Sequence, residues 1–326
     1  MFEIGRVAYT RPHLLADTAE IAIAYGGYDQ ISSNDLLTII KSTPRPDDEL
    51  LPLEEEDVDD NNVEDGLDGA EINAQEQSYI DECMRQIRFR ASSFGSMYPF
   101  VFDGDVLSLK KRISSDNRVY LFLLACARTR SFKIKGTPQR LADAFEKICA
   151  ECLRRIVSSH GDVYMFGPNS SDRKKKFSSN LRKAIPILAS KIGMRLKHGW
   201  ERNYTSSGDG KIDLIGVYNF DNRALGLPVF LGQCASIEDE QQWQKKRLEA
   251  KFSSRSGSFD YLVEPQGILF IPGCYRQPDG DWVNSDLVSD VVTIDRLRLM
   301  AILKGYSGMR QLMDELYEKT EIKYAA

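Results

Sequence analysis

Apolar residues recur with a helical period over much of the chain. The clearest example lies within residues 137–161, where an apolar residue stands at every third or fourth position: Leu141, Phe145, Ile148, Cys152 and Ile156. Such spacing places these side chains on one face of a helix. Similar patterns predict further helices over residues 13–26, 32–42, 76–94, 118–132, 181–196, 238–254, 293–305 and 307–320.

The pattern changes after residue 210. Residues 211–220 and 227–235 are rich in branched apolar side chains without a helical period, and residues 221–226 between them supply turn residues. These features predict two neighbouring strands of a buried sheet. Residues 266–275 form a third strand candidate. Strands that alternate with helices predict an α/β fold with a mainly helical N-terminal region.

Composition bounds the class of protein. Of the 326 residues, 42% are hydrophobic, which is enough for a sizeable core. No stretch approaches the roughly 20 apolar residues of a membrane span, and the first residues lack the apolar segment of a signal peptide. We therefore expect a cytoplasmic protein without a membrane partner. Cys149 and Cys152 form a C-x-x-C pair, but they lie in a helical pattern, which favours core packing over zinc binding.

An acidic segment suggests how the chain is divided. Residues 47–71 hold 13 acidic and no basic residues, a composition typical of disorder. The predicted parts are a small N-terminal segment, an acidic disordered linker, a helical region and the main α/β domain, which span residues 1–44, 45–75, 76–136 and 137–326 respectively. Outside residues 47–71, 43 basic residues stand against 35 acidic ones, so the remaining body could approach a polyanion.

Polar residues stand at the ends of the predicted strands. Asp213 opens the apolar run of the first strand, and Gln233 stands near the end of the second. Burying either side chain costs free energy unless it finds a partner. Glu146 follows Phe145 on the amphipathic helix and offers a second carboxylate. Carboxylates at a sheet edge can hold Mg²⁺, which stabilises the charge that develops during phosphodiester hydrolysis and activates water.

These segments resemble the core motifs of the PD-(D/E)xK nucleases, and within them the Mrr-like restriction endonucleases. The resemblance covers about residues 140–250 and is carried by Phe145-Glu146, by the sequence GDGKIDL at 208–214 and by GQCA at 232–235. It implies a restriction-endonuclease-like fold, in which helices flank a mixed sheet. It also implies an endonuclease that uses Mg²⁺ or Mn²⁺, with Asp213, Glu146 and Gln233 as metal ligands. Asp209 in the same motif is expected to be a turn residue.

One position departs from the family pattern. A lysine normally follows two residues after Gln233, but Ala235 occupies that place. The next predicted helix offers Lys245 and Lys246. Relatives with a GQCA strand carry a tryptophan and then a lysine three residues later, which by resemblance points to Lys246 after Trp243. Lys245 remains an alternative, because adjacent helical residues point about 100° apart and only one of them can face inward.

Basic residues between the two acids suggest contacts with a phosphate backbone. We expect nucleic acid, most naturally DNA, to bind at Arg173, Lys174, Lys175 and Lys176. No phosphate-binding loop for ATP is evident. The resemblance implies the nuclease subunit of a prokaryotic antiviral defence system. Because the chain shows no ATP motif, we expect it to work beside a helicase, an ATPase or a sensor.

Two other functions remain open at this stage. Ala235 could mark a lost site, in which case the chain would be an inactive member of the fold that binds DNA or serves as a scaffold. Alternatively, the acidic residues 47–71 could bind a basic subunit, or cover a basic site on the same chain by imitating a phosphate backbone.

Overall fold

A five-stranded mixed sheet forms the centre of the molecule. The computed structural model describes residues 2–4, 10–42, 69–158, 161–208, 210–220, 224–236 and 240–325. The strands stand in the order β10-β9-β7-β6-β4, with β4 antiparallel to β6, β6 antiparallel to β7, and the remaining neighbours parallel. Their bounds are β4 Gly161–Met165, β6 Leu214–Tyr218, β7 Val229–Cys234, β9 Gln266–Phe270 and β10 Val292–Ile294. The predicted α/β class and the three predicted strands are confirmed.

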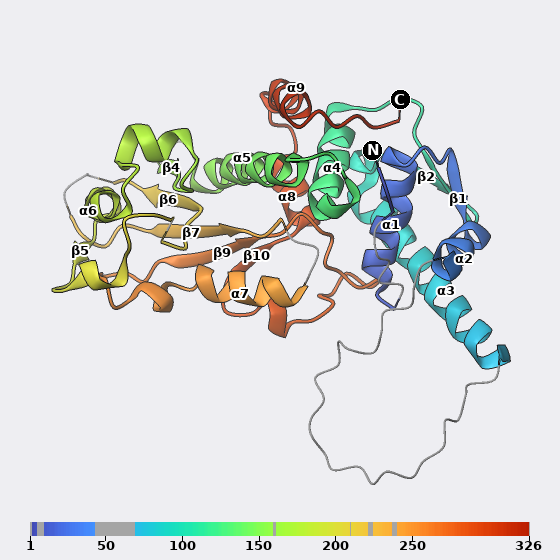
Figure 1. Ribbon diagram of the computed structural model, residues 1–326, viewed down its shortest axis with the longest axis horizontal. Coiled ribbons are helices and arrows are strands. Elements are labelled where there is room, and N and C mark those ends of the chain that lie inside the picture. The colour runs from blue at the N-terminus through green and yellow to red at the C-terminus, as the bar shows by residue number, and fades with distance from the viewer. Residues whose placement is uncertain are drawn as a thin grey trace, which may run out of the picture.

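Two helices cover opposite faces of this sheet (Figure 1). Helix α5, Thr137–Val157, packs against β4, β6 and β7, whereas α7, Glu240–Ala250, packs against β7 and β9. A glycine lets α5 approach closely, because a Cβ added to Gly216 would lie only 2.9 Å from a methyl carbon of Val157. The two helices therefore lie on opposite faces of the sheet and share the central strand β7.

A second apolar cluster lies at one end of the sheet. It is built around α6, Leu181–Lys191, and the short strands β5, Arg195–Leu196, and β8, Phe259–Asp260, which pair antiparallel. The 3₁₀ turns η5, Trp200–Asn203, and η6, Phe252–Arg255, flank these strands. The four basic residues predicted to contact phosphate lie in a single π-helical turn, η4, Arg173–Phe177.

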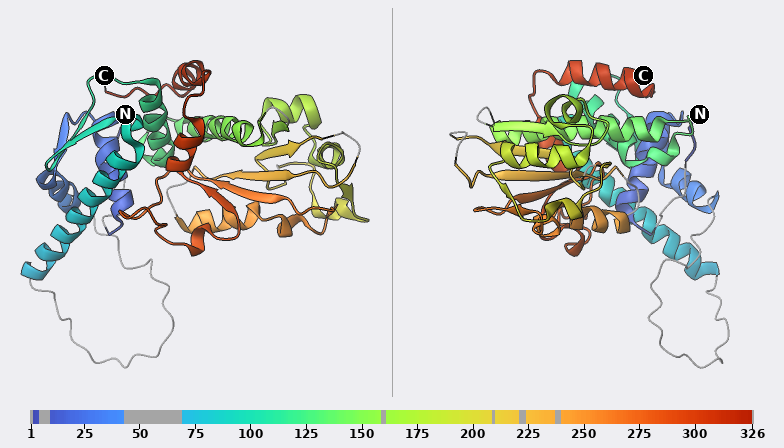
Figure 2. Two further views of the ribbon diagram at one scale, coloured as in Figure 1. Left: turned by 180° about the vertical axis from the view of Figure 1, so that it is seen from behind. Right: turned by 60° about the vertical axis from the view of Figure 1, so that its left-hand side comes forward.

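The N-terminal helices pack at the opposite end (Figure 2). Most of the predicted helices are present: α1 Pro12–Tyr25, α2 Ser33–Ser42, α3 Gly69–Phe94, α4 Ser115–Ala127, α8 Arg296–Leu303 and α9 Met309–Thr320. Three short strands, β1 Gln30–Ser32, β2 Phe100–Asp103 and β3 Val106–Leu109, form a small antiparallel sheet that the sequence pattern did not predict. Short 3₁₀ turns complete the elements: η1 Gly95–Met97, η2 Thr129–Ser131 and η7 Asp286–Val288.

The predicted divisions of the chain do not correspond to separate cores. One apolar cluster joins residues of α1, α3 and α4 to residues of α5, α8 and β9. Helix α3 already begins at Gly69, so a disordered linker is the wrong prediction for residues 69–75. The rest of that predicted linker, residues 45–68, lies outside the described residues. In the described part of the chain, none of the helices is both long and apolar enough to cross a membrane.

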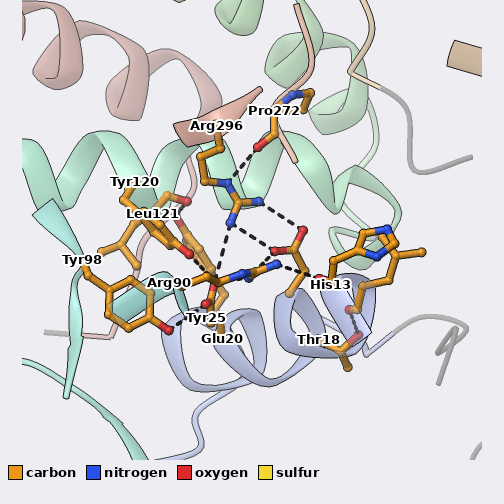
Figure 3. Close-up of polar contacts among 12 residues, drawn as sticks. His13, Thr18, Glu20, Tyr25, Arg90, Tyr98, Tyr120, Leu121, Pro272 and Arg296 are labelled. Atoms are coloured by element: carbon orange, nitrogen blue, oxygen red, sulfur yellow. Dashed lines mark hydrogen bonds and ion pairs between the residues drawn. The ribbon is translucent and has the colours of Figure 1, made fainter. Parts of the chain in front are cut away.

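A buried group of charges joins α1 to α3 and α8 (Figure 3). Nη1 of Arg90 lies 2.7 Å from Oδ1 of Asp17 and 2.9 Å from Oε2 of Glu20. Arg296, the first residue of α8, approaches Oδ1 of Asp17 at 3.1 Å. These four charged side chains are almost fully buried.

Hydroxyl groups complete this network. Tyr98 and Tyr120 donate to the two carboxylate oxygens of Glu20, at 2.8 and 2.7 Å. Burial alone raises the pKa of Asp17, but the nearby charges of Arg296 and Arg90 outweigh burial and lower this pKa below its ordinary value of 3.8. The two acids and two arginines therefore balance in a setting where an unpaired charge would be costly.

We expect Asp17→Ala to lower the free energy of unfolding by about 3–5 kcal/mol, because it leaves two arginines buried with one acid between them. Urea denaturation followed by circular dichroism measures this loss. The control is Asp314→Ala, which removes an exposed partner of Arg118 and should cost no more than about 1 kcal/mol. Equal losses in the two variants would contradict the role given to the buried network.

The same network predicts a pH dependence of stability. Because the folded state holds the pKa of Asp17 below its unfolded value, its contribution is complete above about pH 4 and is lost as the pH falls toward the folded pKa. The difference in unfolding free energy between wild type and Asp17→Asn should therefore shrink on acidification. Urea titrations over a series of acidic pH values measure it, and a constant difference would contradict the assignment.

Candidate active site

The antiparallel pairing of β6 and β7 brings two predicted site residues together. Asp213 stands just before β6, and its backbone N–H donates to the carbonyl oxygen of Gly232 at 3.1 Å. Its carboxylate in turn accepts a hydrogen bond from the backbone N–H of Cys234 at 2.8 Å. Asp213 and Gln233 are both buried, with 5% and 1% of their surfaces exposed. The start of one strand thus lies beside the end of the next.

The side chain of Gln233 links a loop to helix α7. Its Nε2 donates to the carbonyl oxygen of Lys211, and its Oε1 accepts a hydrogen bond from Nζ of Lys246 at 3.1 Å. Lys246 is half-buried and also lies 3.4 Å from Glu249 on the same helix. Lys245 is exposed. Of the two predicted lysines, the structure therefore brings Lys246 to the strand end and leaves Lys245 at the surface.

The second predicted acid approaches from the opposite face of the sheet. Glu146 lies on α5, next to the fully buried Phe145. Its Oε2 would be 3.2 Å from a Cβ added to Gly167, so the missing side chain at Gly167 leaves room for this carboxylate. The residue before Gly167 is held to Asp213, since the backbone N–H of Phe166 donates to the Asp213 carbonyl oxygen at 2.7 Å.

Several neighbouring groups shift the pKa of the Cys234 thiol. Burial raises the pKa of Cys234 to about 11, a hydrogen bond with the Cys149 thiol works in the opposite direction, and the carboxylates of Asp213 and Glu146 raise this pKa further. The positive charge of Lys246 acts on the same thiol and lowers its pKa. Both acids and the lysine thus lie within electrostatic reach of one point at the end of β7.

The donor set differs from the one expected for a metal. In the described residues, no three His, Cys, Asp or Glu side chains gather to hold an ion. The amide oxygen of Gln233 already accepts from Lys246, which favours a positioning role over the predicted ligand role. Asp213 and Glu146 still fit Mg²⁺, because this ion is commonly held by one or two carboxylates, with waters and phosphate oxygens completing its shell.

Packing accounts for the alanine at the usual lysine position. Ala235 is fully buried in a small apolar cluster with Trp243 of α7. Trp243 packs edge-on against Tyr275, with 4.9 Å between ring centroids. A long charged side chain at residue 235 would have to enter this apolar space. The ammonium group at the site comes from α7, one helical turn beyond Trp243.

The predicted phosphate contacts divide into two groups. Arg173 is fully buried: its guanidinium donates to the carbonyl oxygens of Ser178, Phe166 and Gly208. The prediction that Arg173 contacts nucleic acid is therefore wrong, because its donors already fix two loops beside Asp213. The neighbours Lys174, Lys175 and Lys176 are exposed. Lys176 pairs with Asp172 at 3.1 Å.

Two residues near the site were not predicted. Lys211 has a backbone φ of +63°, and its carbonyl oxygen accepts hydrogen bonds from both Gln233 and the buried Arg255. Lys211 lies within the motif GDGKIDL, but the motif assigns no role to its backbone carbonyl, and Arg255 stands in no recognised motif. Asp209, predicted as a turn residue, lies outside the described residues.

Comparison with family models, curated proteins and solved structures found no match for this chain.

The effect of the Asp213 carboxylate on the Cys234 thiol can be tested by alkylation. With a pKa of about 11, Cys234 should react with iodoacetamide roughly three hundredfold more slowly than a free thiol of pKa about 8.5 near neutral pH, because the thiolate is the nucleophile. Asp213→Asn removes one of the charges that raise this pKa and should speed the reaction severalfold. Mass spectrometry of the alkylated peptide measures the rate.

The matched control is Asp260→Asn, which neutralises an exposed aspartate on β8. It should leave the alkylation rate of Cys234 unchanged. An Asp213→Asn protein that reacts no faster than wild type would show that this carboxylate does not govern the thiol.

Proposed function

We propose that this protein is a metal-dependent nuclease of restriction-endonuclease-like fold that hydrolyses phosphodiester bonds in nucleic acid, most naturally DNA. The observation that carries the proposal is the contact between Nζ of Lys246 and Oε1 of Gln233, at 3.1 Å, beside the buried Asp213. This contact supplies an ammonium group at the strand end where the sequence lacks one. The mixed sheet, with α5 on one face and α7 on the other, supports the same proposal.

Each polar group has a distinct role in this proposal. Asp213 and Glu146 would hold Mg²⁺ or Mn²⁺, which when bound activates water and neutralises phosphate charge. The hydrogen bond from the Cys234 N–H fixes the Asp213 carboxylate. Lys246 stabilises the negative charge that develops on the phosphoryl oxygens. Gln233 accepts a hydrogen bond from the ammonium and holds it in place without adding a negative charge to that of Glu249, which lies 3.4 Å from the same Nζ.

A non-cutting relative is the second candidate function. The observation that favours it is the smaller donor set, with two carboxylates and a neutral amide whose oxygen is already occupied. Such a protein would bind DNA or serve as a scaffold subunit. The wider setting, in which a prokaryotic defence system supplies a helicase, an ATPase or a sensor, belongs to the proposal as well and rests on the resemblance of the motifs.

Plasmid degradation in the presence of Mg²⁺ or Mn²⁺ tests the proposal. We expect Asp213→Asn and Glu146→Gln each to lower the cutting rate by at least about a hundredfold, and Lys246→Ala to lower it by about 100- to 1,000-fold. Chelation of divalent ions by EDTA should abolish cutting. Lys245→Ala is the matched control, because it removes the neighbouring, exposed lysine from the same helix and should leave the rate within about twofold of wild type.

The outcomes separate the two candidate functions. Equal cutting by wild type and Asp213→Asn would assign the activity to a contaminant and overturn the nuclease. Binding of DNA without cutting under any of these ions would favour the non-cutting protein. Loss of cutting in Lys245→Ala, with Lys246→Ala active, would move the ammonium role to the other lysine.

A further inference from the structure

A polar cavity adjoins the candidate site on the side of residue 211. Its volume is about 550 Å³, within the range of small-molecule pockets. Four parts of the chain line it: Leu181 at the start of α6, the end of η5 with the residues that follow, the glycine-rich turn before β6, and the residues from η6 to β8. This glycine-rich turn contains Lys211, whose carbonyl oxygen accepts the hydrogen bond from Gln233. The cavity and the strand end therefore share a wall.

A buried arginine makes this shared wall rigid. Arg255 donates to the carbonyl oxygens of Gly210 and Lys211, and also to that of Lys251. The Lys211 carbonyl oxygen thus receives one hydrogen bond from the cavity side and one from Gln233 on the site side. A ligand seated in the cavity would lie next to the Asp213 strand end, with its distance to that end fixed by one peptide group.

The lining has the chemistry of an anion site. Lys211 is exposed and contributes a positive charge, and Ser207 contributes a hydroxyl group, whereas the hydroxyls of Thr205 and Ser254 donate to the carbonyl oxygens of Ser207 and Lys251. The described residues that line the cavity include no acid, and Asp209, between the lining residues Gly208 and Gly210, lies outside the described residues. A ligand can also approach the backbone of Gly208 and Gly257 closely. A Cβ added to Gly208 would lie more than 4 Å from the nearest atom, and one added to Gly257 would lie 3.7 Å from it. Open backbone, a serine hydroxyl and a lysine are typical contacts of phosphate groups.

We propose that this cavity binds the phosphodiester backbone of the nucleic-acid strand immediately beside the bond that is cut. The inference rests on the proposed function, since it takes the scissile phosphate to lie at Asp213 and Glu146. It adds a named subsite and a direction, because the strand would run from Asp213 over Lys211 toward Gly257. The exposed Lys174, Lys175 and Lys176 belong to η4 and do not line this cavity.

Binding measured apart from cutting tests the inference. In an Asp213→Asn background, anisotropy of a fluorescein-labelled oligonucleotide is measured at several salt concentrations. Lys211→Gly removes the ammonium, and glycine suits the positive φ of this residue, so the turn should keep its shape. We expect it to weaken binding about three- to tenfold and to reduce the slope of log affinity against log salt by about 0.7–0.9, the loss of one phosphate contact.

A second variant tests the cavity itself. Gly257→Phe fills open space and should weaken binding at least as much as Lys211→Gly. The control is Lys304→Ala, which removes an exposed lysine at the end of α8 and should leave affinity and salt slope unchanged. If Gly257→Phe binds as the parent does, the cavity is not the subsite and the inference is overturned. Unchanged binding in Lys211→Gly overturns it equally.

The same measurements separate this inference from the nuclease proposal. If the wild-type protein cuts DNA but both cavity variants bind normally, the subsite fails and the nuclease stands. If the wild-type protein does not cut but both variants bind more weakly, the cavity is a strand-binding site on a protein that is not a nuclease. Displacement of the oligonucleotide by AMP at an equal concentration of phosphate groups would assign the cavity to a free nucleotide and overturn the inference.

Discussion

The antiparallel register of β6 and β7 is the constraint on which the candidate site depends. In an antiparallel pair, the beginning of one strand lies beside the end of the other, so residues separated by about twenty positions share one sheet edge. Leu214 pairs with Gly232, which places Asp213 opposite Gln233. The backbone N–H of Cys234 then becomes a donor to the Asp213 carboxylate. A register shift of one residue would turn every side chain of the strand to the other face and separate these groups.

The helices on the two faces reach this edge through different packing. Helix α5 carries Glu146 on one face, and the bare backbone at Gly167 leaves space for its carboxylate. Helix α7 carries Lys246 on the other face, and Trp243 anchors that helix on Tyr275. Tyr275 also packs edge-on against His13 of α1, at 5.3 Å between ring centroids. The N-terminal helices, held by the buried Asp17 network, thus contribute to the position of the lysine.

Sequence patterns predicted the parts of this arrangement that depend on local periodicity. The amphipathic spacing around Phe145 predicted α5, and the branched apolar runs predicted β6 and β7. The burial of Arg173 could not be predicted in this way, because three carbonyl groups from separate segments accept its hydrogen bonds only after folding. For the same reason, no local pattern indicated that α3 begins at Gly69 or that residues 100–109 form a hairpin.

The pairing of a lysine with a neutral amide has an electrostatic consequence. Lys246 already lies 3.4 Å from Glu249, so a glutamate at residue 233 would give the ammonium a second carboxylate partner and would further reduce the positive charge that it can offer to a phosphate. Gln233 can accept from Lys246 and donate to the Lys211 carbonyl oxygen at the same time, so its two polar ends are both satisfied in a nearly fully buried place. The amide therefore orients the lysine at small electrostatic cost. Glu249, which also contacts Lys246, lies on α7 itself rather than on the strand end, so the strand end adds no further negative charge beside Asp213.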